Sequence, residues 1–258
     1  MPSALFALEG KTAVVIGGSS GIGRTLALGL ADAGADVVAS ARRSAQVNAT
    51  AAEIESRGRK TLRVLTDVRD RSSTVALREA ALAAFGKVDI LVNAAGITKK
   101  APTVDFTEAD WLEILDINLT GTLRGCQIFG EHMLQRKSGR IINIASFGSL
   151  LGLYQVTAYN ASKAGVASLT KSLAVEWSRL GVLVNAILPG NFLTEMNSAL
   201  LTGTERGREY LMRTPMGRFG RTEELVGAAV FLASDASSYV TGQLLTVDGG
   251  LLASGVNQ

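Results

Sequence analysis

The chain has 258 residues, 47% of them hydrophobic, so it can bury a sizeable core and is not expected to be disordered. Its 26 basic and 23 acidic residues leave a formal net charge of +3, too small and too dispersed to make a nucleic acid the expected partner. Cys126 is the single cysteine, which excludes an internal disulfide framework, and no apolar run is long enough to cross a bilayer, so we expect a cytoplasmic protein without a membrane partner.

Strand-like and helix-length segments alternate along nearly the whole chain. Short apolar runs predict strands, and the amphipathic runs between them predict helices. The strands are expected at residues 12–16, 37–40, 62–65, 89–92, 140–144, 182–188 and 243–247, and the helices at 22–33, 45–56, 71–85, 108–135, 158–179 and 222–233. Short apolar strands under helices on both faces are typical of a parallel sheet, here a doubly wound α/β fold of the Rossmann type. No linker or repeat divides the pattern, so we expect one catalytic domain over residues 1–258.

A glycine-rich turn joins the first expected strand to the first expected helix. Without a Cβ atom, glycine lets the backbone approach a pyrophosphate, and the amino terminus of the helix offers free N–H groups and a favourable dipole. The G-x-x-x-G-x-G spacing therefore predicts a dinucleotide site, with a tight connection that binds nothing as the alternative. The residues expected to contact the cofactor here are Gly17, Ser19, Ser20, Gly21, Ile22 and Gly23.

The end of the second expected strand indicates which dinucleotide binds. An NAD enzyme usually has Asp or Glu there, about 20 residues after the glycines. This chain has Ala41, followed by Arg42 and Arg43. Because a guanidinium fork suits a 2′-phosphate in geometry and charge, we expect NADP(H), with NAD(H) as the alternative. Otherwise the two arginines would only cap a solvated loop.

Tyr159 and Lys163 are one helical turn apart in the expected helix 158–179. A tyrosine of ordinary pKa is a poor base at neutral pH, and a nearby ammonium stabilises the phenolate and lowers its pKa. Taken alone the pair is weak, since such spacing is common between surface neighbours. Two further polar residues favour a catalytic role for the pair over a chance surface pairing. They are Ser146, just after the expected strand 140–144, and Asn118, in the expected helix 108–135.

From about residue 8 to residue 250 the chain resembles the short-chain dehydrogenase/reductase family. The motifs that carry the resemblance occur in the family's order: the glycine turn, Asp67-Val68, Asn93-Ala94-Ala95-Gly96, Asn118, Ser146, Tyr159 with Lys163, Pro189-Gly190 and Val247-Asp248-Gly249-Gly250. The resemblance implies that Tyr159 exchanges a proton with the carbonyl or alcohol oxygen while Ser146 holds that oxygen. Lys163 would lower the pKa of Tyr159 and bind the nicotinamide ribose, and Asn118 would position a water in a proton relay.

The resemblance also implies further contacts with cofactor and substrate. Asp67 would lie in the adenine-binding turn, although an aspartate there could equally cap a helix. Tyr154 would line the substrate pocket or simply pack. The further residues implied at the cofactor are Val68, Asn93, Ala94, Gly96, Pro189, Gly190, Phe192 and Thr194, and those implied at the substrate are Ser146, Tyr154, Tyr159 and Asn191.

The region of residues 195–219 is expected to fold over the site as a lid that sets specificity. The sequence around it resembles the branch that contains gluconate 5-dehydrogenases and related enzymes, so a small polar ketone, sugar acid or polyol is the expected substrate. A 3-oxoacyl-thioester reductase is the rival enzyme, and Lys99 and Lys100 would suit its carrier protein. A regulator that senses NADP(H) without chemistry is the alternative from another class.

The expected partners are few. His132 is the only histidine and no His/Cys cluster accompanies it, so no metal site is expected. The family resemblance implies a homotetramer, in which the helices at 108–135 and 158–179 would pair across a two-fold axis.

Overall fold

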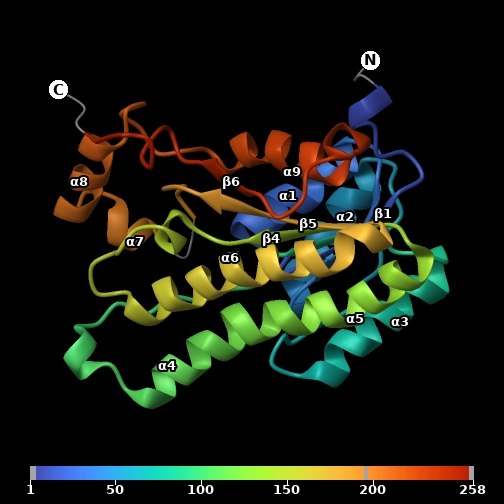
Figure 1. The fold of residues 1–258 in the computed structure, drawn as a ribbon, viewed down its shortest axis with the longest axis horizontal. Helices are drawn as coiled ribbons and strands as arrows, with labels where there is room; N and C mark the ends of the chain where they lie inside the picture. Colours follow the sequence, from blue (N-terminus) through green and yellow to red (C-terminus); the bar gives the residue numbers. More distant parts are fainter. Residues whose placement is uncertain (1–3, 195–196, 256–258) are drawn as a thin grey trace.

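The computed structural model describes residues 4–194 and 197–255. A six-stranded sheet lies between two layers of helices (Figure 1). All neighbouring strands pair in parallel, in the order β2-β1-β3-β4-β5-β6, which confirms the expected doubly wound α/β fold. The strands are β1 (Thr12–Ile16), β2 (Asp36–Ser40), β3 (Ile90–Asn93), β4 (Gly139–Ile144), β5 (Val182–Pro189) and β6 (Leu244–Val247).

The helices fall close to their expected positions. The helices are α1 (Gly21–Asp32), α2 (Ser44–Ser56), α3 (Arg71–Phe85), α4 (Glu108–Leu115), α5 (Gly121–Arg136), α6 (Thr157–Trp177), α7 (Ser198–Leu201), α8 (Glu205–Arg213) and α9 (Val226–Ala233). A π-helical turn, Asp116–Thr120, joins α4 to α5, so the long helix expected at 108–135 forms with one widened turn inside it. Short 3₁₀ turns occupy Ala4–Phe6, Thr103–Asp105, Phe147–Ser149, Ser178–Leu180, Thr222–Leu225 and Asp235–Ser237.

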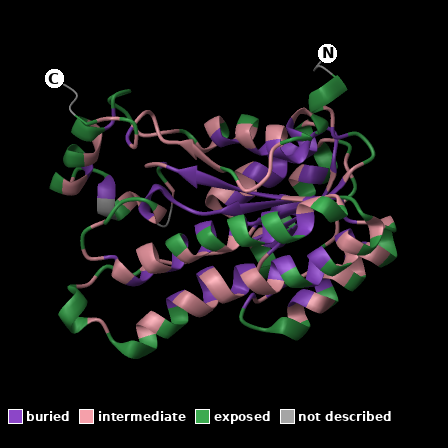
Figure 2. Ribbon diagram, in the orientation of Figure 1, coloured by how far each residue is buried: buried purple, intermediate pink, exposed green. Residues whose placement is uncertain are grey.

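The hydrophobic core lies on both faces of the sheet, because successive side chains of a strand point to opposite faces. Ala13 and Val15 of β1 belong to the core that α1, α2 and α9 cover. Val14 and Ile16 belong to the core that α3, α5 and α6 cover. Figure 2 shows the consequence: the strands are buried, and the exposed residues lie on the outer faces of the helices and in the loops. No helix of the described part of the chain is long and apolar enough to span a membrane.

The strand expected at residues 62–65 does not form, and that prediction was wrong. Only an isolated bridge links Leu65 to Ala41, just beyond the end of β2. The Ser40 hydroxyl donates to the carbonyl oxygen of Val64 at 2.6 Å, so a side chain binds a group that a regular ladder would pair with backbone. Since this segment lies at the edge of the sheet, no second neighbour imposes a regular ladder on it.

The carboxyl ends of the strands carry most of the residues that the sequence singles out. The glycine turn follows β1, Arg42 follows β2, Ser146 follows β4, and Gly190 follows β5. β2 and β3 flank β1 on opposite sides, so the chain reverses direction across the sheet next to β1. In doubly wound folds ligands bind at this reversal, outside the carboxyl ends of the strands.

Candidate active site

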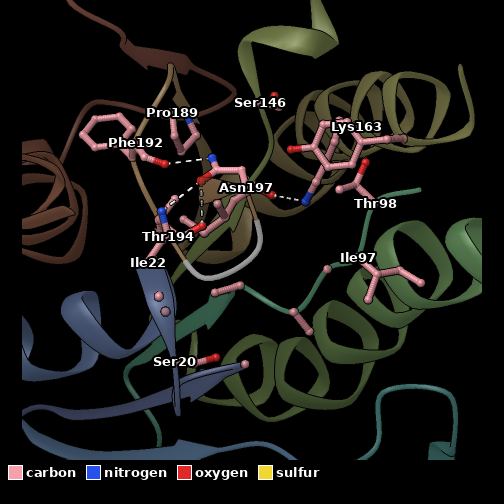
Figure 3. A pocket seen from close by; sticks show the side chains of 18 of the residues that line it. Ser20, Ile22, Ile97, Thr98, Ser146, Lys163, Pro189, Phe192, Thr194 and Asn197 are labelled. Carbon is pink, nitrogen blue, oxygen red and sulfur yellow. Dashed lines mark hydrogen bonds between the residues drawn. The ribbon is translucent and has the colours of Figure 1, made fainter. Parts of the chain in front are cut away.

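A cavity of about 560 Å³ opens at the carboxyl ends of the strands. Figure 3 shows side chains that line it, with Ser146 and Lys163 at one end of the view and Ser20 of the glycine turn at the other. Of the residues expected at the cofactor or substrate, those that line the cavity are Gly17, Ser19, Ser20, Gly21, Ile22, Gly23, Arg42, Arg43, Asp67, Val68, Ala94, Gly96, Ser146, Tyr159, Lys163, Pro189, Gly190, Asn191, Phe192 and Thr194. The exceptions are Asn93, Asn118 and Tyr154.

The glycine turn is built so that no side chain fills it. Gly17 has a φ of +83°, and a Cβ atom there would stand 2.5 Å from the backbone nitrogen of Ala95. A Cβ atom on Gly23 would collide with the carbonyl oxygen of Gly17. The N-cap of α1, Ser20, makes no side-chain cap bond, so its hydroxyl does not occupy the first N–H groups of the helix. A turn of this form holds an anion against the helix amino terminus.

Two arginines carry positive charge beside this turn. Arg42 and Arg43 are exposed, and both line the cavity. Nη2 of Arg43 donates to the hydroxyl of Ser20 at 3.0 Å, which joins the end of β2 to the start of α1. If one anionic group binds at the amino terminus of α1, a second anionic group beside it would therefore meet guanidinium donors.

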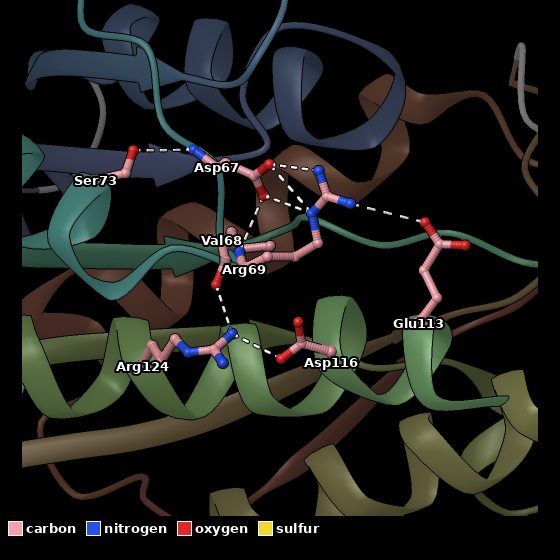
Figure 4. Close-up of polar contacts among 7 residues, drawn as sticks. All are labelled: Asp67, Val68, Arg69, Ser73, Glu113, Asp116 and Arg124. Atoms are coloured by element: carbon pink, nitrogen blue, oxygen red, sulfur yellow. Dashed lines mark hydrogen bonds and ion pairs between the residues drawn. The ribbon is translucent and has the colours of Figure 1, made fainter. Parts of the chain in front are cut away.

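Asp67 also lines the cavity and pairs with Arg69 at 2.7 Å (Figure 4). Hydrogen bonds from Arg69 hold the pKa of the Asp67 carboxyl below its usual range, and the charge of Arg42 adds to this effect. The alternative that Asp67 caps a helix does not apply, because Asp70 is the N-cap of α3 and accepts from the N–H of Ser72. Asp67 stays ionised at the cavity wall.

Val68, the next residue, is fixed by its backbone. Arg124 of α5 donates to the carbonyl oxygen of Val68 at 2.9 Å and also pairs with Asp116 at 2.9 Å. Figure 4 shows this chain of contacts, which runs from the segment before α3 to the π-helical turn. The wall at Asp67 and Val68 is thereby tied to the helix layer beneath it.

Ser146, Tyr159 and Lys163 come together where β4 ends and α6 begins. The Ser146 hydroxyl accepts from the N–H of Gly148 at 3.0 Å and lies close enough to Tyr159 to lower the pKa of its phenol. Nζ of Lys163 lies 5.9 Å from the centroid of the Tyr159 ring and donates to the carbonyl oxygen of Ile144 at 2.7 Å. Tyr159 and Lys163 thus share one face of α6, with Ser146 facing Tyr159 from the neighbouring strand.

Burial governs the pKa values in this group. It lowers the pKa of Lys163, whose residue is only 5% exposed, from 10.5 to about 8. It also raises the pKa of Tyr159, and the hydrogen bond with Ser146 opposes this rise without cancelling it. Desolvation of the phenolate therefore outweighs the other influences in the protein alone, and the expected lowering of the Tyr159 pKa by Lys163 stays a prediction.

Asn118 does not line the cavity, although it lies directly behind the wall. Its Nδ2 atom donates to the carbonyl oxygen of Ile97 at 2.9 Å and to the hydroxyl of Ser162 at 3.0 Å. Its Oδ1 atom accepts from the N–H of Ile97 at 2.8 Å. The side chain is fully buried and braces the segment after β3 against α6. Both amide hydrogens of Asn118 are thus engaged within the protein, so they cannot make the expected contact with a water.

Asn93 also lies behind the cavity. Its Nδ2 atom donates to Oδ1 of Asn143 at 2.9 Å, and Nδ2 of Asn143 donates to the hydroxyl of Thr170 at 3.0 Å. This buried chain of hydrogen bonds crosses from β3 through β4 to α6. It stabilises the strands that carry the site, whereas Asn93 itself does not line the cavity at which the resemblance placed it.

Two residues of α8 are among those at the site that sequence reasoning did not single out. Arg206 and Tyr210 line the cavity, and the ring of Tyr210 meets that of Phe147 edge-on at 5.9 Å. Tyr154 is instead 76% exposed, and its carbonyl oxygen, not its ring, contacts Arg206. The segment 195–219, which is expected to form a lid, includes α7 and α8. Its residues 195–196 lie outside the part of the chain that the structure describes. No motif marks Arg206, so only its position in the lid could have pointed to it.

Asn197, the residue before α7, bonds the segment that follows β5. Its Oδ1 atom accepts from the N–H of Thr194 at 2.9 Å, and its Nδ2 atom donates to the carbonyl oxygen of Phe192 at 2.8 Å (Figure 3). Sequence reasoning did not single out Asn197, which also lines the cavity. Its two bonds shape the segment on which Phe192 and Thr194 are presented.

Comparison with known proteins agrees with this geometry. A family model described as enoyl-(acyl carrier protein) reductase matches residues 16–252. Gluconate 5-dehydrogenase of Gluconobacter oxydans (strain 621H) is 41% identical over 250 residues, which are 97% of this chain and 98% of that protein. D-threitol dehydrogenase of Mycolicibacterium smegmatis (strain ATCC 700084 / mc(2)155) is 41% identical over 245 residues, 95% of this chain and 94% of that protein.

The solved structures give the same result. A gluconate 5-dehydrogenase from Burkholderia cenocepacia J2315, in complex with NADP and tartrate, superimposes with a TM-score of 0.94. It is 39% identical in sequence, and the match covers 97% of this chain and 98% of that one. Fold and sequence likeness therefore extend over nearly the whole chain.

Proposed function

This chain belongs to the short-chain dehydrogenase/reductase family, and we propose that it transfers a hydride between NADP(H) and a secondary alcohol or ketone of a small sugar acid. The observation that carries the proposal is the meeting of Ser146, Tyr159 and Lys163 on the wall of the cavity. Arg42 and Arg43 line the same cavity beside the glycine turn, where the phosphates of a dinucleotide would lie.

The cavity fits a dinucleotide with an extra phosphate. The turn around Gly17 and Gly23 has no room for a Cβ atom, and the amino terminus of α1 adjoins it. These features suit the pyrophosphate, and Arg42 and Arg43 suit a 2′-phosphate. The gluconate 5-dehydrogenase from Burkholderia cenocepacia binds NADP, which supports the same choice here.

The acid/base work falls to Tyr159. In reduction its hydroxyl donates a proton to the carbonyl oxygen of the substrate, and in oxidation the phenolate removes the proton of the alcohol. Ser146 holds that oxygen by a hydrogen bond. Lys163 stabilises the phenolate through its charge, which most molecules carry at neutral pH because its pKa is about 8. When bound, the nicotinamide ring supplies or accepts the hydride.

The sugar-acid assignment is supported by the relative whose name includes gluconate, a sugar acid; another relative is named for D-threitol, a neutral polyol.

A thioester reductase is less well supported. Lys99 pairs with Asp110 at 2.5 Å, and neither Lys99 nor Lys100 lines the cavity, so the basic patch that would suit a carrier protein is not at its wall.

The test is the change in nicotinamide absorbance at about 340 nm with purified protein. NADP⁺ and NAD⁺ are offered with sugar acids and polyols, and NADPH with the corresponding ketones and with an acetoacetyl thioester. We expect the fastest turnover with NADP(H) and a sugar acid or its keto form. Preference for the thioester would contradict the substrate assignment, and preference for NAD(H) would contradict the role of the two arginines.

We further infer a cytoplasmic homotetramer. Large apolar side chains are exposed on the outer layer, among them Leu112 of α4 and Val175 of α6, which would be covered if these helices paired with a second copy. The single cysteine fits a reducing compartment. Light scattering of the purified protein should give four times the mass of the chain, and the mass of one chain would contradict the inference.

A further inference from the structure

The cavity carries one positive charge for which the proposed function has no use. Within the described residues, its cationic side chains are Arg42, Arg43, Lys163 and Arg206. The first two lie at the end of β2, and Lys163 is bonded to the carbonyl oxygen of Ile144 beside Tyr159. Arg206 comes from α8, at the end of the molecule toward which the strands point (Figure 1). It is therefore the cation left for the substrate.

Arg206 is held in place on the substrate side by three contacts. Its guanidinium carbon lies 5.6 Å from the centroid of the Tyr210 ring, and its Nη2 atom donates to the hydroxyl of the same residue at 3.3 Å. Its Nη1 atom donates to the carbonyl oxygen of Tyr154 at 3.1 Å. Tyr210 in turn packs edge-on against Phe147, which directly follows Ser146. The guanidinium is thus linked through packed rings to the residue that holds the reacting oxygen.

The fork of Arg206 keeps capacity for a ligand. A guanidinium has five N–H donors, and the two hydrogen bonds above engage two of them. No carboxylate of the described residues pairs with it, whereas neighbouring Arg213 pairs with Glu209. The side chain is half-buried, which leaves it reachable from the cavity that it lines.

The surroundings make this charge effective. Phe147, Leu153 and Leu201 line the cavity along with Arg206, so much of the nearby wall is apolar. A charged hydrogen bond is stronger in such surroundings than in water, because the local dielectric is lower. Arginine also matches a carboxylate with two parallel N–H···O bonds. A neutral hydroxyl group would gain much less from the same fork.

We propose that Arg206 binds the carboxylate of the substrate and thereby determines that the enzyme acts on sugar acids in preference to neutral polyols. The inference rests on the proposed function and narrows its substrate class. Arg206 positions the acid for Tyr159 and takes no part in the proton or hydride steps.

Three variants test the proposal. Arg206→Gln removes the charge and keeps a polar side chain, and Arg206→Lys keeps the charge without the fork. Arg208→Gln is the control, because Arg208 carries the same charge on the same helix but is exposed and does not line the cavity. Initial rates are measured with NADP⁺ and either gluconate or glucitol, which has a neutral alcohol group in place of the carboxylate.

We expect Arg206→Gln to raise KM for gluconate by about 10- to 100-fold, the usual value of a charged hydrogen bond, with kcat changed much less. KM for glucitol should stay unchanged, Arg206→Lys should recover part of the loss, and Arg208→Gln should behave like the wild type. An equal effect on gluconate and glucitol, or no effect on either, would overturn the proposal.

A binding measurement separates this inference from the proposed function. Gluconate is titrated into the wild type and Arg206→Gln, each saturated with NADPH, by calorimetry. Weaker gluconate binding to the variant than to the wild type supports the carboxylate site. If the wild type binds gluconate but turns it over too slowly to measure, that result counts against the proposed reaction and not against the carboxylate site. Equal binding to both proteins, or no binding to the wild type, overturns the inference.

Discussion

Lys163 shows how burial at one residue prepares the site. Its pKa falls to about 8 because the ammonium is desolvated, and the carbonyl oxygen of Ile144 is its hydrogen-bond acceptor. Burial therefore disfavours the charged form of Lys163, which makes the free energy of unfolding depend on pH.

Stability of the protein without cofactor should rise with pH from about 8, the pKa of Lys163 in the folded chain, toward 10.5, the pKa of a fully solvated lysine. In this window the unfolded chain binds the proton and the folded chain does not, so the free energy of unfolding rises by roughly 1 kcal/mol per pH unit. Urea titrations should show the rise in the wild type and its absence in Lys163→Met. The same pH dependence in both proteins would contradict the assignment.

Arg42 is the side chain that we propose favours NADP(H) over NAD(H). Arg42→Ala should lower the preference for NADP⁺ over NAD⁺ by about 10- to 100-fold, since one charged contact to the 2′-phosphate is lost. The rate with NAD⁺ should be unaffected. Arg179→Ala is the control, because it removes the same charge from an exposed turn outside the cavity. An unchanged ratio of kcat/KM values would show that Arg42 is only a solvated loop residue.

At the scale of elements, the site depends on turns that widen or tighten the backbone. The π-helical turn between α4 and α5 carries Asn118, whose side chain bonds the backbone of Ile97. The glycine turn before α1 is also close-packed, because a Cβ atom on Gly23 would collide with the carbonyl oxygen of Gly17. A side chain there must push the turn open.

Gly23→Ala should therefore lower the free energy of unfolding by about 1–3 kcal/mol, as overpacking does, and weaken NADPH binding. Gly227→Ala is the matched control in α9, since a Cβ atom at that position meets nothing within 4 Å. It should leave NADPH binding unchanged and stabilise the helix by up to about 1 kcal/mol. Urea titration and NADPH fluorescence measure both effects. Equal NADPH affinity in the two variants would contradict the assigned role of the turn.

Over the whole molecule, hydrophobic patterning was enough to predict the layers and the parallel sheet. The runs at β1 and α3 were placed at their bounds, because their patterning coincides with clear ends such as Asp70 and Gly86. The segment at 62–65 was not predictable in the same way. Its apolar residues resemble a strand, yet whether a ladder forms there depends on the neighbours at the edge of the sheet.

The site was predictable where a motif marks it and not where tertiary contacts create it. Tyr159, Lys163 and Ser146 follow from spacing and family motifs. Arg206 does not, because its place depends on Tyr210 and on the backbone of Tyr154, which lies far from it in sequence. The direction of the Tyr159 pKa shift was also beyond the sequence, since it depends on how deeply the folded chain buries the phenol.

The most direct test of the account is the turnover of Tyr159→Phe beside its affinity for NADPH. The substitution removes only the hydroxyl, so kcat should fall by about 10²- to 10⁴-fold, the range for loss of a general acid/base, while the dissociation constant for NADPH stays the same. Tyr239→Phe, at a fully exposed position, should match the wild type in both measurements. Turnover retained in Tyr159→Phe would contradict the central claim that this residue moves the proton.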